Sequence, residues 1–177
     1  DHDGKEQQRK DLNARLGPVI GNQLAMLSQN MDGNSRTFIQ KLDEIDDPEL
    51  RTLVLAQFEK VTGQTMKSFI ETCEDWNNNG KNRDKDAALQ LIDDKRGKSE
   101  QTIAKMKPEI REALEKQAND RAIQILSATT AHDSSDENMQ KIFRALGTSN
   151  PVEIEMTRAA VRRLTNGESN LYQAIDN

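Results

Sequence analysis

The chain has 177 residues, of which 34% are hydrophobic, 31% charged and only 3% aromatic, and its formal net charge is −5. This length suits one sizeable hydrophobic core and is short for two domains, and no apolar run approaches the roughly 20 residues that a membrane-spanning helix needs. The acidic balance argues against a general nucleic-acid binder and against attraction to anionic lipid, because both partners require a basic surface.

The first helix is predicted to follow a polar N-terminal segment. Residues 1–13 are almost wholly polar, and we expect a flexible tail there. Apolar residues then recur at helical spacing: Leu12, Leu16, Val19, Ile20, Leu24, Leu27 and Met31. Gly17-Pro18 interrupts this run. Because proline destabilises a helix interior by about 3 kcal/mol, we expect the main helix to start at Pro18 or to kink there.

The longest helical repeat of apolar residues runs from Asp47 to Trp76. Its members are Leu50, Val54, Phe58, Val61, Met66, Phe69, Cys73 and Trp76. Asp47 is the expected N-cap of this helix and Pro48 its first residue. Gly63 lies within the repeat, where it favours a close helix crossing or a slight bend. A shorter helix before it carries Phe38, Ile39, Leu42 and Ile45.

The boundaries of the later helices follow from proline, glycine and asparagine. Pro108 and Pro151 each open a helix, the second behind Asn150, and Gly167 ends the last one. Two shorter helices are predicted from apolar residues: one with Ala87, Ala88, Leu91 and Ile92, which Arg96-Gly97 ends, and one with Met139, Ile142, Phe143 and Leu146.

These elements together predict an all-α fold. We expect a bundle of roughly six to eight amphipathic helices packed around a long central helix, about residues 48–76. Residues 14–177 are expected to form a single helical domain after the tail of residues 1–13. The low aromatic content agrees with this prediction, since β-rich domains favour β-branched and aromatic residues.

The polar segment from Asp75 to Asp86 carries alternating oxygen donors around a glycine. Asp75, Asn77 and Asn79 alternate, Gly80 permits a sharp turn, Lys81 offers its carbonyl and Asp86 a closing carboxylate. The segment resembles the calcium loop of EF-hand proteins, which implies Ca²⁺ bound by Asp75, Asn77, Asn79, Lys81 and Asp86. It departs from that family at Asn82, where an aliphatic residue is usual, and at Asp86, which replaces the usual Glu. No second loop is visible, so a metal-free connecting loop is the alternative.

The other reactive side chains are isolated in the sequence. Cys73 lies on the apolar repeat without a neighbouring His, so we expect a small buried hydrophobe. His2 and His132 fall in polar segments, and two His with one Cys are too few for a zinc site. Four arginines are expected on a solvated helix face, with a site for an acidic partner as the alternative: Arg144, Arg158, Arg162 and Arg163.

From these patterns we expect a non-enzymatic helical binding protein that acts through a groove between helices on a protein partner or an apolar ligand. The expected groove residues are Phe58, Met66 and Phe69. The first alternative is a calcium-binding protein that uses the loop at 75–86, and calcium is the only cofactor that the sequence indicates. The second alternative is a hydrolase that relies on carboxylates. Because the chain begins at Asp1 rather than Met, its compartment stays open, with secretion favoured over the cytoplasm.

Overall fold

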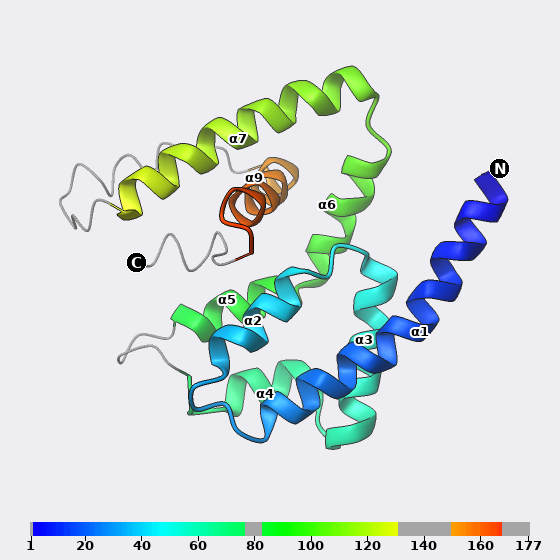
Figure 1. The fold of residues 1–177 in the computed structure, drawn as a ribbon, viewed down its shortest axis with the longest axis vertical. Helices are drawn as coiled ribbons and strands as arrows, with labels where there is room; N and C mark the ends of the chain where they lie inside the picture. Colours follow the sequence, from blue (N-terminus) through cyan, green and yellow to red (C-terminus); the bar gives the residue numbers. More distant parts are fainter. Residues whose placement is uncertain (1, 77–82, 131–149, 168–177) are drawn as a thin grey trace. The chain divides into compact units, whose positions relative to one another are not determined.

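The structure is a computed structural model that describes residues 2–76, 83–130 and 150–167. These residues form eight α-helices and contain no strand, so the predicted all-α class is confirmed (Figure 1). Contacts within the chain divide it into two compact units, Asp1–Ile92 and Asp93–Asn177. The single domain predicted over residues 14–177 stays a prediction, because compactness alone does not decide whether each unit folds independently.

Five helices build the first unit: α1 (His2–Ser28), α2 (Ser35–Asp43), α3 (Pro48–Thr62), α4 (Met66–Thr72) and α5 (Arg83–Leu91). α1 packs mainly along α3, α2 contacts both α1 and α5, and α4 lies against α3 and α5. Asp47 caps α3 as predicted, since its carboxylate accepts hydrogen bonds from the backbone N–H groups of Glu49 and Leu50 at 2.9 and 3.4 Å.

α1 differs from its prediction at both its start and its middle. It begins at His2, so residues 2–13 are helical, and it continues through Pro18 without a new start; the flexibility expected for residues 1–13 stays a prediction. The side chain of Asn13 donates a hydrogen bond to Asp47 Oδ2 at 2.9 Å, which ties this part of α1 to the beginning of α3. Pro18 removes one helical hydrogen bond, and the packing of α1 along α3 compensates for that loss.

Gly17 and Gly21 bring α1 and α3 into close contact. A Cβ atom added to Gly17 would lie 2.6 Å from the Leu53 Cβ. One added to Gly21 would lie 2.6 Å from the Gln57 Cβ and 2.9 Å from the carbonyl oxygen of Val54. Non-bonded carbon atoms prefer separations of about 3.5–4.0 Å. A side chain at either position would therefore push the two helices apart.

The predicted central helix over residues 48–76 is in fact two helices, α3 and α4. Gly63 is the C-cap of α3 and adopts the left-handed conformation, with φ 76°. Such a residue ends a right-handed helix, and a Cβ added to Gly63 would meet no described atom within 4 Å, so the predicted close crossing at Gly63 is wrong. Thr65 then caps α4, because its hydroxyl accepts a hydrogen bond from the N–H of Ser68 at 3.1 Å. The apolar repeat simply continues across this break.

Four aromatic rings occupy the core of the first unit. The centroid of the Phe38 ring, from α2, lies 6.4 Å from that of Phe58 and 5.8 Å from that of Phe69. The Trp76 ring lies 6.1 Å from Phe38 in an edge-on arrangement, which aromatic pairs prefer. Aliphatic side chains complete this core: Leu24, Ile39, Leu42, Val54, Ile70 and Leu91.

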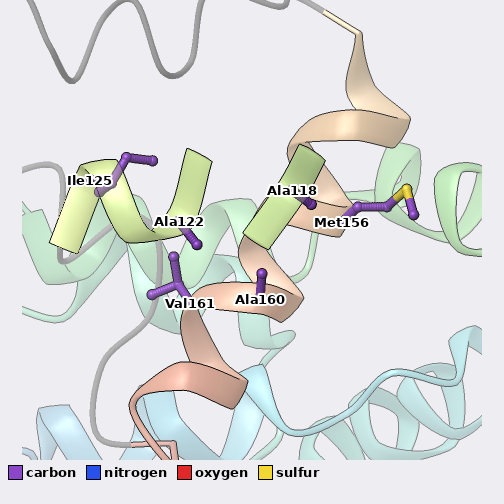
Figure 2. Close-up of a cluster of buried hydrophobic side chains, with 6 residues drawn as sticks. All are labelled: Ala118, Ala122, Ile125, Met156, Ala160 and Val161. Carbon is purple, nitrogen blue, oxygen red and sulfur yellow. The ribbon is translucent and has the colours of Figure 1, made fainter. Parts of the chain in front are cut away.

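In the second unit, the structure describes α6 (Asp94–Ala104), α7 (Pro108–Thr130) and α9 (Pro151–Leu164). α9 contacts both α6 and α7. Figure 2 shows small side chains where α7 faces α9, with Ala122 and Val161 directed toward one another and Ala118 and Ala160 nearby. Small side chains at such a contact shorten the distance between the helix axes.

The predicted boundaries of α9 are confirmed. Asn150 is its N-cap, and the Asn150 side chain accepts a hydrogen bond from the N–H of Val152 at 2.9 Å. After the helix, Asn166 and Gly167 have positive φ values of 53° and 82°. The Gly167 N–H donates to the carbonyl of Arg162 at 2.8 Å, which closes the end of the helix.

The predicted stop at Arg96-Gly97 is wrong, because both residues lie inside α6. Asp93 caps this helix by accepting a hydrogen bond from the N–H of Lys95 at 2.9 Å, so the boundary falls between α5 and α6. The predicted helix around Phe143 lies outside the described residues. None of the helices in the described part of the chain is both long and apolar enough to cross a membrane.

The close contact between α1 and α3 leads to a test with Gly21→Ala. Alanine normally favours a helix over glycine by about 1 kcal/mol, but here its Cβ would collide with Gln57 and Val54. We expect the free energy of unfolding to fall by about 1–3 kcal/mol, the usual cost of overpacking. Urea denaturation followed by Trp76 fluorescence measures it. The exposed helix position Gln8, changed to Ala, is the control, and a Gly21→Ala protein as stable as this control would contradict the close contact.

Candidate functional site

The predicted calcium loop lies mostly outside the described residues. Asp75 is exposed after α4, whereas Asn77, Asn79 and Lys81 lie in the segment that is not described. Asp86 lies in α5, but its side chain is not described. Among the residues that the structure describes, no group of three or more His, Cys, Asp and Glu side chains could hold a metal ion. The calcium site therefore stays a prediction.

The predicted groove residues form part of a closed core. Phe58 is 0% exposed and Met66 is 2% exposed, while Phe69 is half-buried. Phe69 lies 5.6 Å from Phe58 between ring centroids, and Phe38 packs on both. Phe58 and Met66 are thus covered in this structure, and a groove at these residues stays a prediction. The sequence identified an apolar face correctly but not the helix that covers it.

Cys73 lies at the end of α4 rather than deep in the core. It is half-buried and free, and its backbone N–H donates to the carbonyl of Phe69 at 2.9 Å as the C-cap of α4. His2 lies in α1, at the N-terminal end, and His132 lies outside the described residues.

Arg158 is buried in an ion-pair cluster, so the solvated helix face predicted for it is wrong. Its Nη2 atom lies 2.7 Å from Glu155 Oε1, and Arg96 Nε of α6 lies 3.1 Å from the same oxygen. All three side chains are buried, with Arg158 only 1% exposed. A buried charge requires a partner of opposite sign. The spacing of Glu155 and Arg158 signals their pair in the sequence, but no sequence signal marks Arg96.

Glu155 carries its negative charge in this cluster. Burial by itself raises the pKa of its carboxyl, but the charges of Arg158 and Arg96 and the hydrogen bonds from both outweigh burial, so the pKa lies below its ordinary value of 4.5. The remaining predicted arginines are placed differently. Arg162 is half-buried, Arg163 is exposed and donates to Asn119 of α7, and Arg144 lies outside the described residues.

A second polar cluster joins α1 to α3. Asp47 Oδ2 accepts hydrogen bonds from Arg9 Nη1 at 2.7 Å and from Asn13 at 2.9 Å. Arg9 also pairs with Glu6 and, at 3.2 Å, with Glu49. Burial of Asp47 raises the pKa of its carboxyl, but the hydrogen bonds from Asn13 and Arg9 outweigh it, and the pKa lies below 3.8. The cluster holds the first half of α1 in place.

One face of α1 carries a line of apolar side chains that the described helices leave at least one third exposed. Leu12, Leu16, Val19 and Met26 follow one another at steps of four, three and seven residues, which places them on one helix face. Their exposed fractions are 51%, 36%, 50% and 73%. We call these four residues the α1 apolar stripe. Leu24, in the same helix, is fully buried, so α1 is covered on one side only.

This stripe differs from the scattered exposure of other apolar residues. Among the described residues, the other exposed large apolar side chains are Leu53 and Val61 in α3, Ile110 and Ile123 in α7, and Leu164 in α9. No three of these share a helix face. Single exposed apolar residues are normal, whereas an exposed apolar line is typical of a binding surface.

The comparisons with known proteins add no family. No protein-family model matches the chain, and no curated protein and no solved structure matches it. The α1 apolar stripe is therefore chosen as the candidate site because its exposed apolar side chains share one helix face.

The buried cluster around Glu155 leads to a stability test with Glu155→Gln. Loss of the charge leaves two buried guanidinium groups without their shared carboxylate, and breaking a buried pair destabilises a protein by about 3–5 kcal/mol. We expect a loss in that range, measured by urea denaturation with circular dichroism. Glu115→Gln, which breaks the exposed pair with Arg111, should cost about 0.3–0.5 kcal/mol. Equal effects of the two substitutions would refute the structural role of the cluster.

The depressed pKa values of Asp47 and Glu155 predict a loss of stability in acid. A carboxyl whose folded pKa lies below its unfolded pKa stabilises the protein above the unfolded value, and this contribution disappears as pH falls through the folded value. We expect the free energy of unfolding to fall between roughly pH 5 and pH 2. In Asp47→Asn the fall should be smaller, because one of the two groups no longer titrates. A denaturation series over pH with an unchanged slope in this variant would count against the prediction.

Proposed function

We propose that the protein is a non-enzymatic helical binding protein that docks a protein partner on the α1 apolar stripe. The observation that carries the proposal is the exposure of four large apolar side chains along one helix face. Fully burying such a side chain stabilises an association by about 1.5–3 kcal/mol, and these side chains are between one third and three quarters exposed. Covering the stripe would therefore be favourable at each position.

A protein partner fits this surface better than an apolar small molecule. Ligand pockets enclose most of their ligand between several elements, whereas the stripe lies on a single helix. A hollow of about 520 Å³ beside α7 has a largely charged lining in the described residues: Glu109, Glu112, Ala113, Glu115, Lys116 and Asn119. Four of these six residues are charged, whereas ligand pockets are lined mostly by apolar side chains. An amphipathic helix, in contrast, buries an apolar line on a partner helix directly.

The proposal moves the binding surface away from Phe58, Met66 and Phe69. Those side chains support α1 indirectly, because they fill the core on which the covered face of α1 rests. The calcium-binding protein and the carboxylate hydrolase stay predictions from the sequence.

A display experiment tests the proposed function without a known partner. A phage library of helical peptides would be selected on the immobilised full chain, and the selected peptides would be measured by fluorescence anisotropy. We expect Val19→Gln to weaken their binding about fivefold, since it removes a half-exposed apolar contact of about 1 kcal/mol. Val61→Gln is the matched control, because Val61 is equally exposed, at 51%, but lies on α3.

Two outcomes would overturn the proposal. One is a selection that yields no peptide sensitive to Val19→Gln. The other is equal sensitivity to Val19→Gln and Val61→Gln. Circular dichroism of both variants establishes that they keep their helices.

A further inference from the structure

Resting on the proposed function, we infer that the partner of the α1 apolar stripe is an acidic amphipathic helix. The charged groups next to the stripe are cations, although the chain as a whole has a net charge of −5. An apolar line with basic borders is complementary to an apolar line with acidic borders.

Arg15 borders the stripe on α1. It follows Leu12 by three residues and precedes Val19 by four, so helical spacing places it next to both residues on the helix surface. Lys5 lies seven residues before Leu12, on the same face two turns earlier. Both side chains belong to exposed residues, and neither forms an ion pair with any residue that the structure describes. Their charges are therefore available to a partner.

Lys41 of α2 borders the other side of the stripe. Its Nζ atom donates to Gln23 Oε1 at 3.2 Å, and Gln23 lies between Val19 and Met26 on the stripe face. Because glutamine is neutral, this contact positions the ammonium group without neutralising it, and Lys41 forms no ion pair within the described part of the chain. The stripe thus has cations along both borders.

The neighbouring acidic groups lie behind these cations. Asp11 lies one turn before Arg15, further round the helix from the stripe, and accepts a hydrogen bond from Gln7 at 2.9 Å. Glu44 lies one turn after Lys41, at the end of α2. Arg9, three residues before Leu12, is engaged by Glu6, Asp47 and Glu49. A partner that lies along the stripe therefore meets Lys5, Arg15 and Lys41 before it meets an acid.

Two other occupants fit these charges less well. A second copy of the chain would bring the same three cations to the interface and no closer acid to pair with them. An anionic lipid surface would attract the cations, but the stripe holds no aromatic residue, and the net charge of the chain opposes binding. The acidic helix satisfies both the apolar and the charged part of the surface.

Two synthetic peptides of about 18 residues test this inference on the full chain. Both peptides carry leucine at alternating steps of three and four residues. Glutamate borders this apolar line in one peptide, and glutamine borders it in the other. We expect the glutamate peptide to bind at least tenfold more tightly at low ionic strength, with the difference shrinking as salt screens the charges. Fluorescence anisotropy titrations measure both affinities.

Charge variants of the protein sharpen the comparison. Arg15→Gln should weaken the glutamate peptide about threefold and leave the glutamine peptide unchanged. Lys10→Gln is the matched control, since Lys10 is an exposed cation of α1 that does not border the stripe, and it should change neither affinity.

Each other outcome has a distinct meaning. Equal binding of both peptides, weakened by Val19→Gln, would overturn the acidic partner and leave the proposed function intact. Absence of peptide binding would overturn the inference if one of the other two occupants is found instead. A second copy of the chain would be shown by a dimer in sedimentation equilibrium that Val19→Gln abolishes, and a lipid surface by binding of the chain to phosphatidylserine vesicles. Absence of all of these, together with a failed peptide selection, would overturn the proposed function itself.

Discussion

The close packing of α1 on α3 at Gly17 and Gly21 is the contact on which the first unit depends. With a Cβ at either position, the added atom would lie 2.6 Å from a carbon atom of α3. Glycine ordinarily weakens a helix. These two residues therefore lower the stability of α1 itself but permit a shorter distance between α1 and α3. That distance permits Asn13 and Arg9 to reach Asp47 at the start of α3.

The same contact decides which face of α1 is left open. Once Gly17, Gly21 and Leu24 lie against their neighbours, Leu12, Val19 and Met26 must point away from them, because helical periodicity separates the two sets. The proposed binding surface is thus a consequence of the packing that stabilises α1. Close contact and hydrogen bonds hold the helix on one side, and a surface that is already ordered loses less entropy on binding.

The second unit is held together by alanine contacts and a buried ion-pair cluster. Alanines at the contact of α7 and α9 allow the helices to approach, and Ile103 of α6 packs against this core. The carboxylate of Glu155 contacts Arg158 of its own helix and Arg96 of α6, and so connects α6 to α9. Such a cluster adds geometric specificity, because each charge is tolerated in the interior only when its partners are in place.

The sequence by itself determined the helical class and many helix boundaries, because these depend on neighbouring residues. Asp47, Asn150 and Pro108 mark helix starts through capping and through the fixed φ of proline, and Gly167 marks an end. Gly63 also had a local signal, a glycine followed by the capping Thr65, but the continuing apolar repeat concealed it.

Only the tertiary structure decided which apolar and charged side chains are covered. Phe58 and Leu12 both occur at helical spacing, yet one is buried and the other half exposed, because coverage depends on helices distant in sequence. The spacing of Glu155 and Arg158 likewise indicates that they can pair, but only the folded chain buries this pair and brings Arg96 of α6 to the same carboxylate. Periodicity states which residues share a face, but burial requires a second surface, and the position of that surface is a property of the folded chain.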